Sequence, residues 1–228
     1  MKYNDDTRAD KGSLRSPAEG EINEFRSILT NWYRDFGRDF HWRKRTASLY
    51  EKVVSEVLLQ RTRAETVASF FPVFIHRFPS WKSLASAPES EIGSFIRPIG
   101  LWRRRAESLS RLAREMARRN GRFPRGRREI ETLPGVGQYI ANAIQLFCHG
   151  EPTPLLDVNM ARLLGRYFAG REFSDTRRDP YLQELSRRVV DCNDPQRMNW
   201  AILDFAALVC KARNPRHEIF PLREGCVS

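Results

Sequence analysis

Apolar residues recur at helical spacing along most of this chain, and this periodicity constrains its fold more than any other feature. They fall three and four residues apart, as the buried stripe of an amphipathic helix requires. The expected helical segments are residues 25–33, 53–58, 64–78, 89–96, 102–119, 127–132, 138–147, 158–168, 180–190 and 195–210. Because no alternating run of β-branched residues is long enough for a strand, the expected fold class is all-α.

The first 20 residues lack this periodicity. They are rich in Asp, Arg, Ser and Gly, and we expect a disordered lead-in. They also lack the apolar core of a signal peptide, and no stretch of the chain approaches the roughly 20 apolar residues of a membrane span. We therefore expect a soluble, intracellular protein.

Four cysteines, at positions 148, 192, 210 and 226, are scattered along the 228 residues. They are too few for the disulfide framework of a secreted domain, and a chain of this length can bury a core without one. We expect free thiols.

The chain is strongly basic, with 39 Lys and Arg against 28 Asp and Glu, and residues 103–128 hold 11 arginines against two glutamates. A pI near 10.0 favours a polyanionic partner, nucleic acid first, and arginine forks match phosphate oxygens well. The alternative for such a run is a solvated helix face.

A glycine loop, Leu133-Pro134-Gly135-Val136-Gly137, stands between two of the expected helices. Glycine tolerates left-handed dihedrals and close backbone approach, which a tight hairpin requires. The bare amides at the following helix N-terminus can hold a DNA phosphate without reading sequence. The alternative is an ordinary tight turn between helices.

A carboxylate, Asp157, follows Gly137 by twenty residues, among apolar neighbours at the expected start of a helix. Asp is common as a helix N-cap, and this role is compatible with a catalytic one.

These motifs together carry a family resemblance. Residues 133–168 resemble the hairpin and catalytic loop of the endonuclease III and adenine glycosylase superfamily, the helix-hairpin-helix (HhH-GPD) DNA glycosylases. Further similar blocks are residues 40–43, 55–62, 99–101, 105–107 and 199–210, so the resemblance extends from about residue 40 to residue 226.

The resemblance implies an all-α architecture of two lobes with the active-site cleft between them. We expect a central helical domain at residues 49–147, which holds the hairpin, and a terminal lobe made of residues 21–48 and 148–228.

The resemblance also implies two catalytic carboxylates. Asp157 matches the aspartate that stabilises the cationic sugar and activates water, and Glu56 matches the glutamate that acts at the base; two carboxyl groups can divide this labour. By periodicity Glu56 lies off the stripe of Val53 and Val57 and on the side of Gln60, so the alternative is a solvent-facing glutamate.

Tyr139 falls where bifunctional relatives carry a lysine that forms a Schiff base with the sugar. Tyrosine cannot form that imine, so the resemblance implies a monofunctional enzyme with weak or no strand cleavage at abasic sites. A tyrosine here resembles the thymine-DNA mismatch glycosylases in particular. The alternative is a core tyrosine that fills the hairpin.

Positions that enter the duplex are also implied. Extrusion of a base costs a few kcal/mol, least for a mispair, and leaves a hole to be filled. The family's wedge and plug positions, which fill that hole, are matched here by Leu101 and by Gln60 or Arg61. The alternative for Leu101 is that it is an ordinary loop residue. In this context we expect the arginines of residues 103–128 to contact phosphates.

The family's iron-sulfur motif is degenerate. Cys210 and Cys226 occupy its first and fourth cysteine positions, but His217 and Phe220 occupy the second and third. Phe cannot ligate iron, so we expect no [4Fe-4S] cluster and no other cofactor. Residual zinc binding stays open, since three possible ligands are present, Cys210, His217 and Cys226, but the sequence offers no evident fourth ligand.

The predicted function is a DNA glycosylase that releases T or U opposite G from double-stranded DNA with a flipped base. We expect a cytoplasmic, nucleoid-associated monomer. One alternative is an adenine glycosylase acting opposite G or oxidised G. The other is a non-catalytic helix-hairpin-helix DNA-binding module, which the presence of both Asp157 and Glu56 disfavours.

Overall fold

The structure, a computed structural model, describes residues 14–173, 175–176 and 178–216. All regular elements of these residues are helical, which confirms the expected all-α class. The elements are α1 (Glu19–Phe36), η1 (His41–Arg43), α2 (Leu49–Leu59), α3 (Ala64–Arg77), α4 (Trp81–Ser86), α5 (Glu89–Ile96), η2 (Arg97–Ile99), α6 (Trp102–Arg118), α7 (Arg127–Glu131), α8 (Gln138–His149), α9 (Val158–Leu164), η3 (Gly165–Ala169), α10 (Pro180–Val190) and α11 (Pro195–Leu208).

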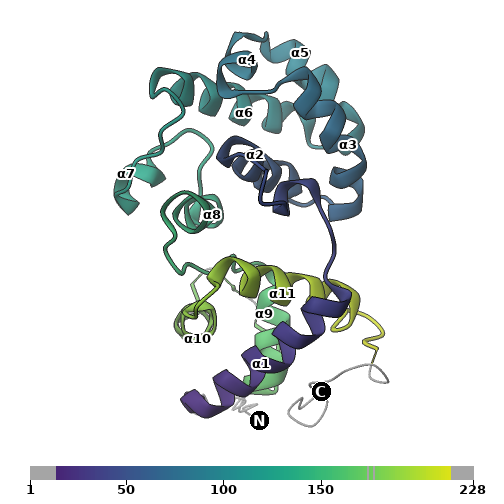
Figure 1. Ribbon diagram of the computed structural model, residues 1–228, viewed down its shortest axis with the longest axis vertical. Coiled ribbons are helices and arrows are strands. Elements are labelled where there is room, and N and C mark those ends of the chain that lie inside the picture. The colour runs from purple at the N-terminus through teal and green to yellow at the C-terminus, as the bar shows by residue number, and fades with distance from the viewer. Residues whose placement is uncertain (1–13, 174, 177, 217–228) are drawn as a thin grey trace, which may run out of the picture.

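The helices form two groups along the long axis of the molecule (Figure 1). Helices α3 to α6 lie at one end, α1, α9, α10 and α11 lie at the other, and α2 and α8 run between them. The N-terminal helix α1 packs against α10 and α11, so the two ends of the described chain share one group. No helix in the described part of the chain combines the length and the hydrophobicity needed to cross a bilayer.

Each group has its own hydrophobic cluster. The first joins residues of η1, α2 to α8 and their connections around side chains such as Phe71. The second joins α1 with α9, α10 and α11 around side chains such as Phe205. A small cluster of Ala143, Leu146 and Leu155 lies where the chain passes from α8 towards α9.

The first cluster begins earlier in the chain than the expected boundary at residue 49. Phe40 and Trp42 belong to it, although the sequence analysis assigned residues 21–48 to the terminal lobe. The reason is aromatic packing: Phe40 stacks on Trp42 with ring centroids 4.7 Å apart, and Trp42 meets Phe71 edge-on at 5.2 Å. Apart from this correction, the two-domain division stays a prediction.

Most expected helices occur within two residues of their predicted bounds, and the segments 89–96 and 180–190 match at both ends. The expected helix 158–168 is divided, because α9 ends at Leu164 and a π-helical turn continues to Ala169. Glycine permits this turn: a Cβ on Gly165 would stand 2.5 Å from the carbonyl oxygen of Arg171. The sequence analysis missed α4, which Ser80 caps by accepting from the Ser83 amide at 3.1 Å.

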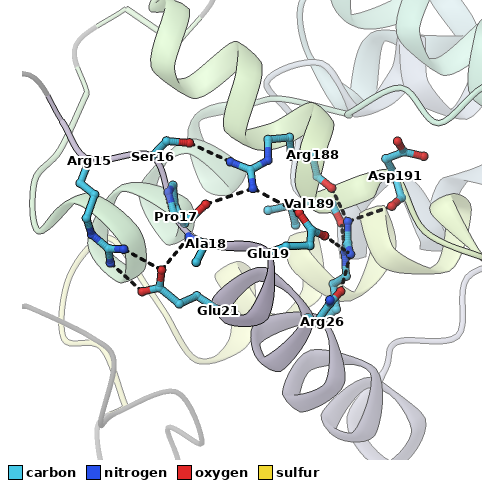
Figure 2. A network of polar contacts seen from close by, with 11 residues as sticks. Arg15, Ser16, Pro17, Ala18, Glu19, Glu21, Arg26, Arg188, Val189 and Asp191 are labelled. Atoms are coloured by element: carbon cyan, nitrogen blue, oxygen red, sulfur yellow. Dashed lines mark hydrogen bonds and ion pairs between the residues drawn. The ribbon is translucent and has the colours of Figure 1, made fainter.

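Part of the expected disordered lead-in is ordered, which corrects the prediction for residues 14–20. Arg15 forms a bidentate ion pair with Glu21 at 2.6 and 2.8 Å, and Ser16 accepts a hydrogen bond of 2.8 Å from Arg188 of α10 (Figure 2). These polar contacts do not depend on apolar periodicity, so the pattern analysis did not detect them. Residues 1–13 lie outside the described residues.

Candidate active site

Glu56 lies in the middle of α2 and is buried, with 3% of its surface exposed. Helix α2 starts with a capping box, in which Ser48 accepts from the Glu51 amide and Glu51 accepts from the Ser48 amide. Helix α2 packs against η1, α3, α6 and α8, and residues 53–58 are all buried. The solvent-facing alternative for Glu56 is therefore wrong.

Tyr139 lies in the first turn of α8, directly after the glycine hairpin. Its half-buried ring packs against the first hydrophobic cluster, and its hydroxyl donates a hydrogen bond of 3.0 Å to Oε2 of Glu56. Tyr139 thus both packs and presents its hydroxyl to a buried acid, so the core-tyrosine alternative describes only the ring.

Asp157 is the N-cap of α9. Its Oδ1 accepts from the amides of Asn159 and Met160, both at 2.9 Å, and its Oδ2 accepts from the side-chain amide of Asn159 at 2.7 Å. Asn159 in turn accepts from Arg162 at 3.0 Å. Three N–H donors therefore fix the orientation of a half-buried carboxylate, and the capping role is confirmed.

The electrostatics of these groups differ although they are neighbours. Burial raises the pKa of Glu56 to about 7; the hydrogen bond from Tyr139 and the charge of Arg43 oppose this rise, and the charge of Asp157 adds to it. Burial also raises the pKa of Asp157, against hydrogen bonds from Met160 and Asn159 that favour its anion. Burial and the two acids hold the pKa of Tyr139 well above 10, so its hydroxyl stays a donor.

A buried ion-pair network lies behind the site, and sequence analysis missed it. Arg43 of η1 donates to both carboxylate oxygens of Asp204 at 2.8 and 3.0 Å, and Arg38 donates to them through its backbone amide and its side chain. Asp204, on α11, has no exposed surface. One signal was present in the sequence: an aspartate within the otherwise apolar segment 200–210 requires a buried partner.

The glycine hairpin joins α7 to α8. Gly135 has φ +73°, and a Cβ there would stand 3.0 Å from the Cβ of Ser108, so both glycine requirements apply to it. Gly137 has φ −95° and open space at its Cβ position, so neither requirement applies. Gly137 is the N-cap of α8 and is exposed, as is Gln138 after it, whereas Val136 between the glycines is buried.

The expected wedge and plug residues lie on two loops that adjoin one another. Leu101, the N-cap of α6, has φ +51° and is 50% exposed, which is unusual for a leucine. Gln60 and Arg61 follow α2 and are exposed, and Arg61 has φ +57°. The Thr62 hydroxyl donates to the carbonyl oxygen of Ile99 at 3.3 Å and so connects the loops.

The arginine-rich segment does not form one uniform basic surface. Arg105 is buried, Arg119 pairs with Glu115 at 2.7 Å, and Arg127 pairs with Glu131 at 2.7 Å. The remaining members include exposed side chains on α6 and after it, at positions 103, 104, 111, 114, 118, 122, 125 and 128. Two of these also form ion pairs, Arg111 with Glu107 at 3.4 Å and Arg118 with Glu115. The phosphate-contacting role of this segment stays a prediction.

The degenerate iron-sulfur motif lies almost entirely outside the described residues, which end before His217, Phe220 and Cys226. Cys210 is buried, and Arg166 lies 3.8 Å from its sulfur. Among the described residues, no group of three or more His, Cys, Asp or Glu side chains is arranged to hold a metal ion. The expectation that no cofactor is bound stays a prediction.

Comparison with known proteins gives concordant results. Residues 54–188 match the HhH-GPD superfamily of base excision DNA repair proteins. The chain is 37% identical to a thymine-DNA glycosylase of Aeropyrum pernix over 92% of this chain and 96% of that protein. It is 31% identical to an adenine DNA glycosylase of Buchnera aphidicola, over 90% of this chain and 58% of that protein. A solved structure of a thermostable thymine-DNA glycosylase superposes with a TM-score of 0.82 and 32% identity over 91% of this chain and 95% of the other.

Proposed function

This chain belongs to the HhH-GPD superfamily of base excision DNA repair proteins, and from that premise we propose that it releases thymine or uracil mispaired with guanine from double-stranded DNA. The activity is that of a DNA N-glycosylase, which hydrolyses the bond between a base and its deoxyribose. The observation that carries the proposal is the Tyr139–Glu56 hydrogen bond of 3.0 Å close to Asp157, because it puts an acid and an anion at one site.

The two carboxyl groups are suited to different steps. When the glycosidic bond breaks, its electron pair leaves with the base, and a hydrogen-bond donor or proton lowers the energy of that leaving group. A Glu56 carboxyl with a pKa of about 7 retains its proton in a large fraction of molecules at neutral pH and supplies it.

Asp157 is suited to the second step, in which the sugar becomes cationic and water attacks it. Its three N–H donors favour the carboxylate anion, which stabilises positive charge at the sugar's anomeric carbon. The same carboxylate accepts the proton of the water that attacks that carbon. The glycosidic bond is thereby replaced by a C–O bond, and the products are a free base and an intact abasic site.

Water is the proposed nucleophile because Tyr139 offers no amine. A lysine at the start of α8 would point at this site and form an imine with the sugar, whereas the Tyr139 hydroxyl with its raised pKa is not deprotonated near neutral pH. The proposal therefore includes little or no strand cleavage.

Thymine or uracil is preferred as the released base for two reasons. Relatives named as thymine or thymine/uracil glycosylases are 35–37% identical to this chain over most of both sequences. Tyr139 also matches that branch. Adenine opposite guanine or oxidised guanine is the second candidate, since the adenine DNA glycosylase of Buchnera aphidicola is 31% identical and Glu56 suits protonation of a purine.

The test is single-turnover incubation with duplexes that carry G·T, G·U, A·G and oxidised G·A pairs, followed by hot alkali to cut at abasic sites. We expect alkali-dependent cleavage at the T and U positions. Cleavage at adenine alone would replace the first candidate with the second. Strand breaks without alkali would contradict the role given to Tyr139, and no product from any duplex would overturn the proposal.

A further inference from the structure

Arg105, in the first turn of α6, is buried with 4% of its surface exposed, and its hydrogen bonds differ from those of a typical buried arginine. A buried charge ordinarily pairs with an acid. The guanidinium of Arg105 instead donates to the carbonyl oxygens of Ile99 and Gly100 at 3.0 and 2.7 Å, to the Thr62 hydroxyl at 2.6 Å and to the Gln60 carbonyl oxygen. All four acceptors belong to the two loops described above.

These loops contain backbone conformations that need support. Arg61 and Leu101 both have positive φ, at 57° and 51°, and neither is a glycine. A non-glycine residue in the left-handed region is strained and persists only where its surroundings hold it there. Arg105 binds the residue before each of them, through the carbonyl oxygens of Gln60 and Gly100.

We propose that Arg105 is a positioning residue for base extrusion, which holds the Gln60–Arg61 loop and the Leu101 loop at a fixed spacing so that both enter the duplex already formed. This inference rests on the proposed function. A planar guanidinium suits the task because its N–H donors are spread in one plane and reach four acceptors on two loops, whereas the ammonium of a lysine has three donors at one point. Loops ordered before binding need not be ordered while the base pair opens.

A second arginine in the molecule provides a matched control. Arg26 of α1 also donates to backbone carbonyl oxygens, those of Arg188, Val189 and Asp191 at the end of α10 (Figure 2). Unlike Arg105, it also pairs with Glu19 at 3.0 Å and donates to Asn23 at 2.6 Å. It belongs to the other helix group and contacts neither loop. Arg26→Lys therefore removes a similar guanidinium from a similar carbonyl set without changing the proposed DNA contacts.

The prediction concerns a ratio of rates. Excision of U opposite G requires a pair to be opened, whereas U opposite a tetrahydrofuran abasic analogue has no partner to leave. We expect Arg105→Lys to slow excision from U·G about 10- to 100-fold more than excision from U opposite the analogue, because misplaced loops impair opening and not bond cleavage. Arg26→Lys should change both rates equally, whatever it does to the melting temperature.

The experiment measures single-turnover rates on both duplexes for the wild type, Arg105→Lys, Arg26→Lys and Thr62→Val. Thr62→Val removes one of the four acceptors with little change in volume, and we expect a selective loss of about 3- to 10-fold. It keeps the test decisive if Arg105→Lys does not fold. Equal losses on the two duplexes for the folded variants would overturn the inference, whereas a wild type that releases no base from either duplex would overturn the proposed function instead.

Discussion

Buried carboxyl groups occur in two regions that adjoin Arg43, and their surroundings differ. At the candidate site Glu56 is 3% exposed, and within the described residues the hydrogen bond found on its carboxyl group comes from a neutral donor, Tyr139. Behind the site Asp204 has no exposed surface and accepts from the guanidinium groups of Arg38 and Arg43. The two carboxyl groups are buried to a similar extent, but in the described part of the chain only Asp204 accepts hydrogen bonds from positively charged groups.

This difference separates a chemical role from a structural one. Removing a carboxyl group from water penalises its charged form, and a positive partner at hydrogen-bond distance offsets the penalty. Asp204 has two such partners and connects α11 to the segment before η1. Among the residues that the structure describes, no cation is bonded directly to Glu56, so burial raises its pKa to about 7 and leaves it able to give or accept a proton near neutral pH.

We expect the largest loss of activity from a change at a third carboxylate, Asp157, which has a chemical role as Glu56 does. Asp157→Asn keeps an oxygen that accepts from the Asn159 and Met160 amides, and asparagine is a good N-cap, so α9 should stay folded. Loss of the negative charge should slow single-turnover excision about 10⁴-fold.

The control for Asp157→Asn is duplex binding and the melting temperature, both of which should stay near the wild-type values. An Asn variant that retains excision within tenfold would remove Asp157 from the mechanism. It would also leave Glu56 as the acid on which the chemistry depends.

The structural role of Asp204 predicts a loss of stability when its carboxyl group is removed. Asp204→Ala leaves Arg38 and Arg43 without their buried acceptor, and loss of one partner of such a network typically costs 3–5 kcal/mol, so we expect the free energy of unfolding in urea to fall by about 4 kcal/mol. Glu65→Gln is the matched control, since the ion pair of Glu65 with Arg38 is 64% exposed on the acid side and should contribute below about 1 kcal/mol.

The activity of the Asp204→Ala protein sharpens the same comparison. Under conditions where this variant is folded, we expect excision within about tenfold of the wild type. A folded variant as inactive as Asp157→Asn would show that Asp204 acts in the chemistry and would break the distinction drawn here.

The raised pKa of Glu56 predicts a pH dependence of stability. Below pH 4.5 the group is protonated in both the folded and the unfolded state. Between pH 4.5 and about 7 the unfolded chain releases the proton first, so the folded state binds more protons and stability falls as pH rises through this window. A shift from 4.5 to about 7 corresponds to about 3 kcal/mol, lost by pH 7 and constant above it.

Glu56→Gln provides the measurement. Glutamine does not titrate, so the difference in unfolding free energy between variant and wild type should change by about 3 kcal/mol from pH 4.5 to pH 7.5, in favour of the variant at the higher pH. A difference that is the same at both pH values would show that burial does not raise the pKa of Glu56.

The sequence predicted those parts of the structure that depend on local pattern. Helix positions followed from apolar spacing, the hairpin from Gly135, and the N-cap role from Asp157 at the start of α9. Each of these features is encoded within a few neighbouring residues.

Features that join distant segments were not predicted. Periodicity alone placed Glu56 towards solvent, and only the family resemblance favoured a functional position. An apolar stripe marks one face of a helix, whereas α2 contacts η1, α3, α6 and α8. The Asp204 network joins residues more than 160 positions apart, and the acceptors of Arg105 include Gln60, 45 positions away. Such pairings depend on how the helices pack, which no single stretch of sequence specifies.

The smallest expected change in activity concerns the Tyr139 hydroxyl, which donates a hydrogen bond to Glu56. The hydrogen bond from Tyr139 lowers the pKa of Glu56, so Tyr139→Phe should raise that pKa further. If neutral Glu56 is the active form, the fall of excision at alkaline pH should move to higher pH in the variant, while the rate at pH 7 changes by about tenfold or less. The measurement is a single-turnover pH profile on U·G duplex for both proteins, with hot alkali omitted in a parallel series. A rate that instead rises with pH through this range, with the rising limb moved to higher pH in the variant, would mean that the anion of Glu56 is the active form. The chemical role argued for its burial would then be reversed.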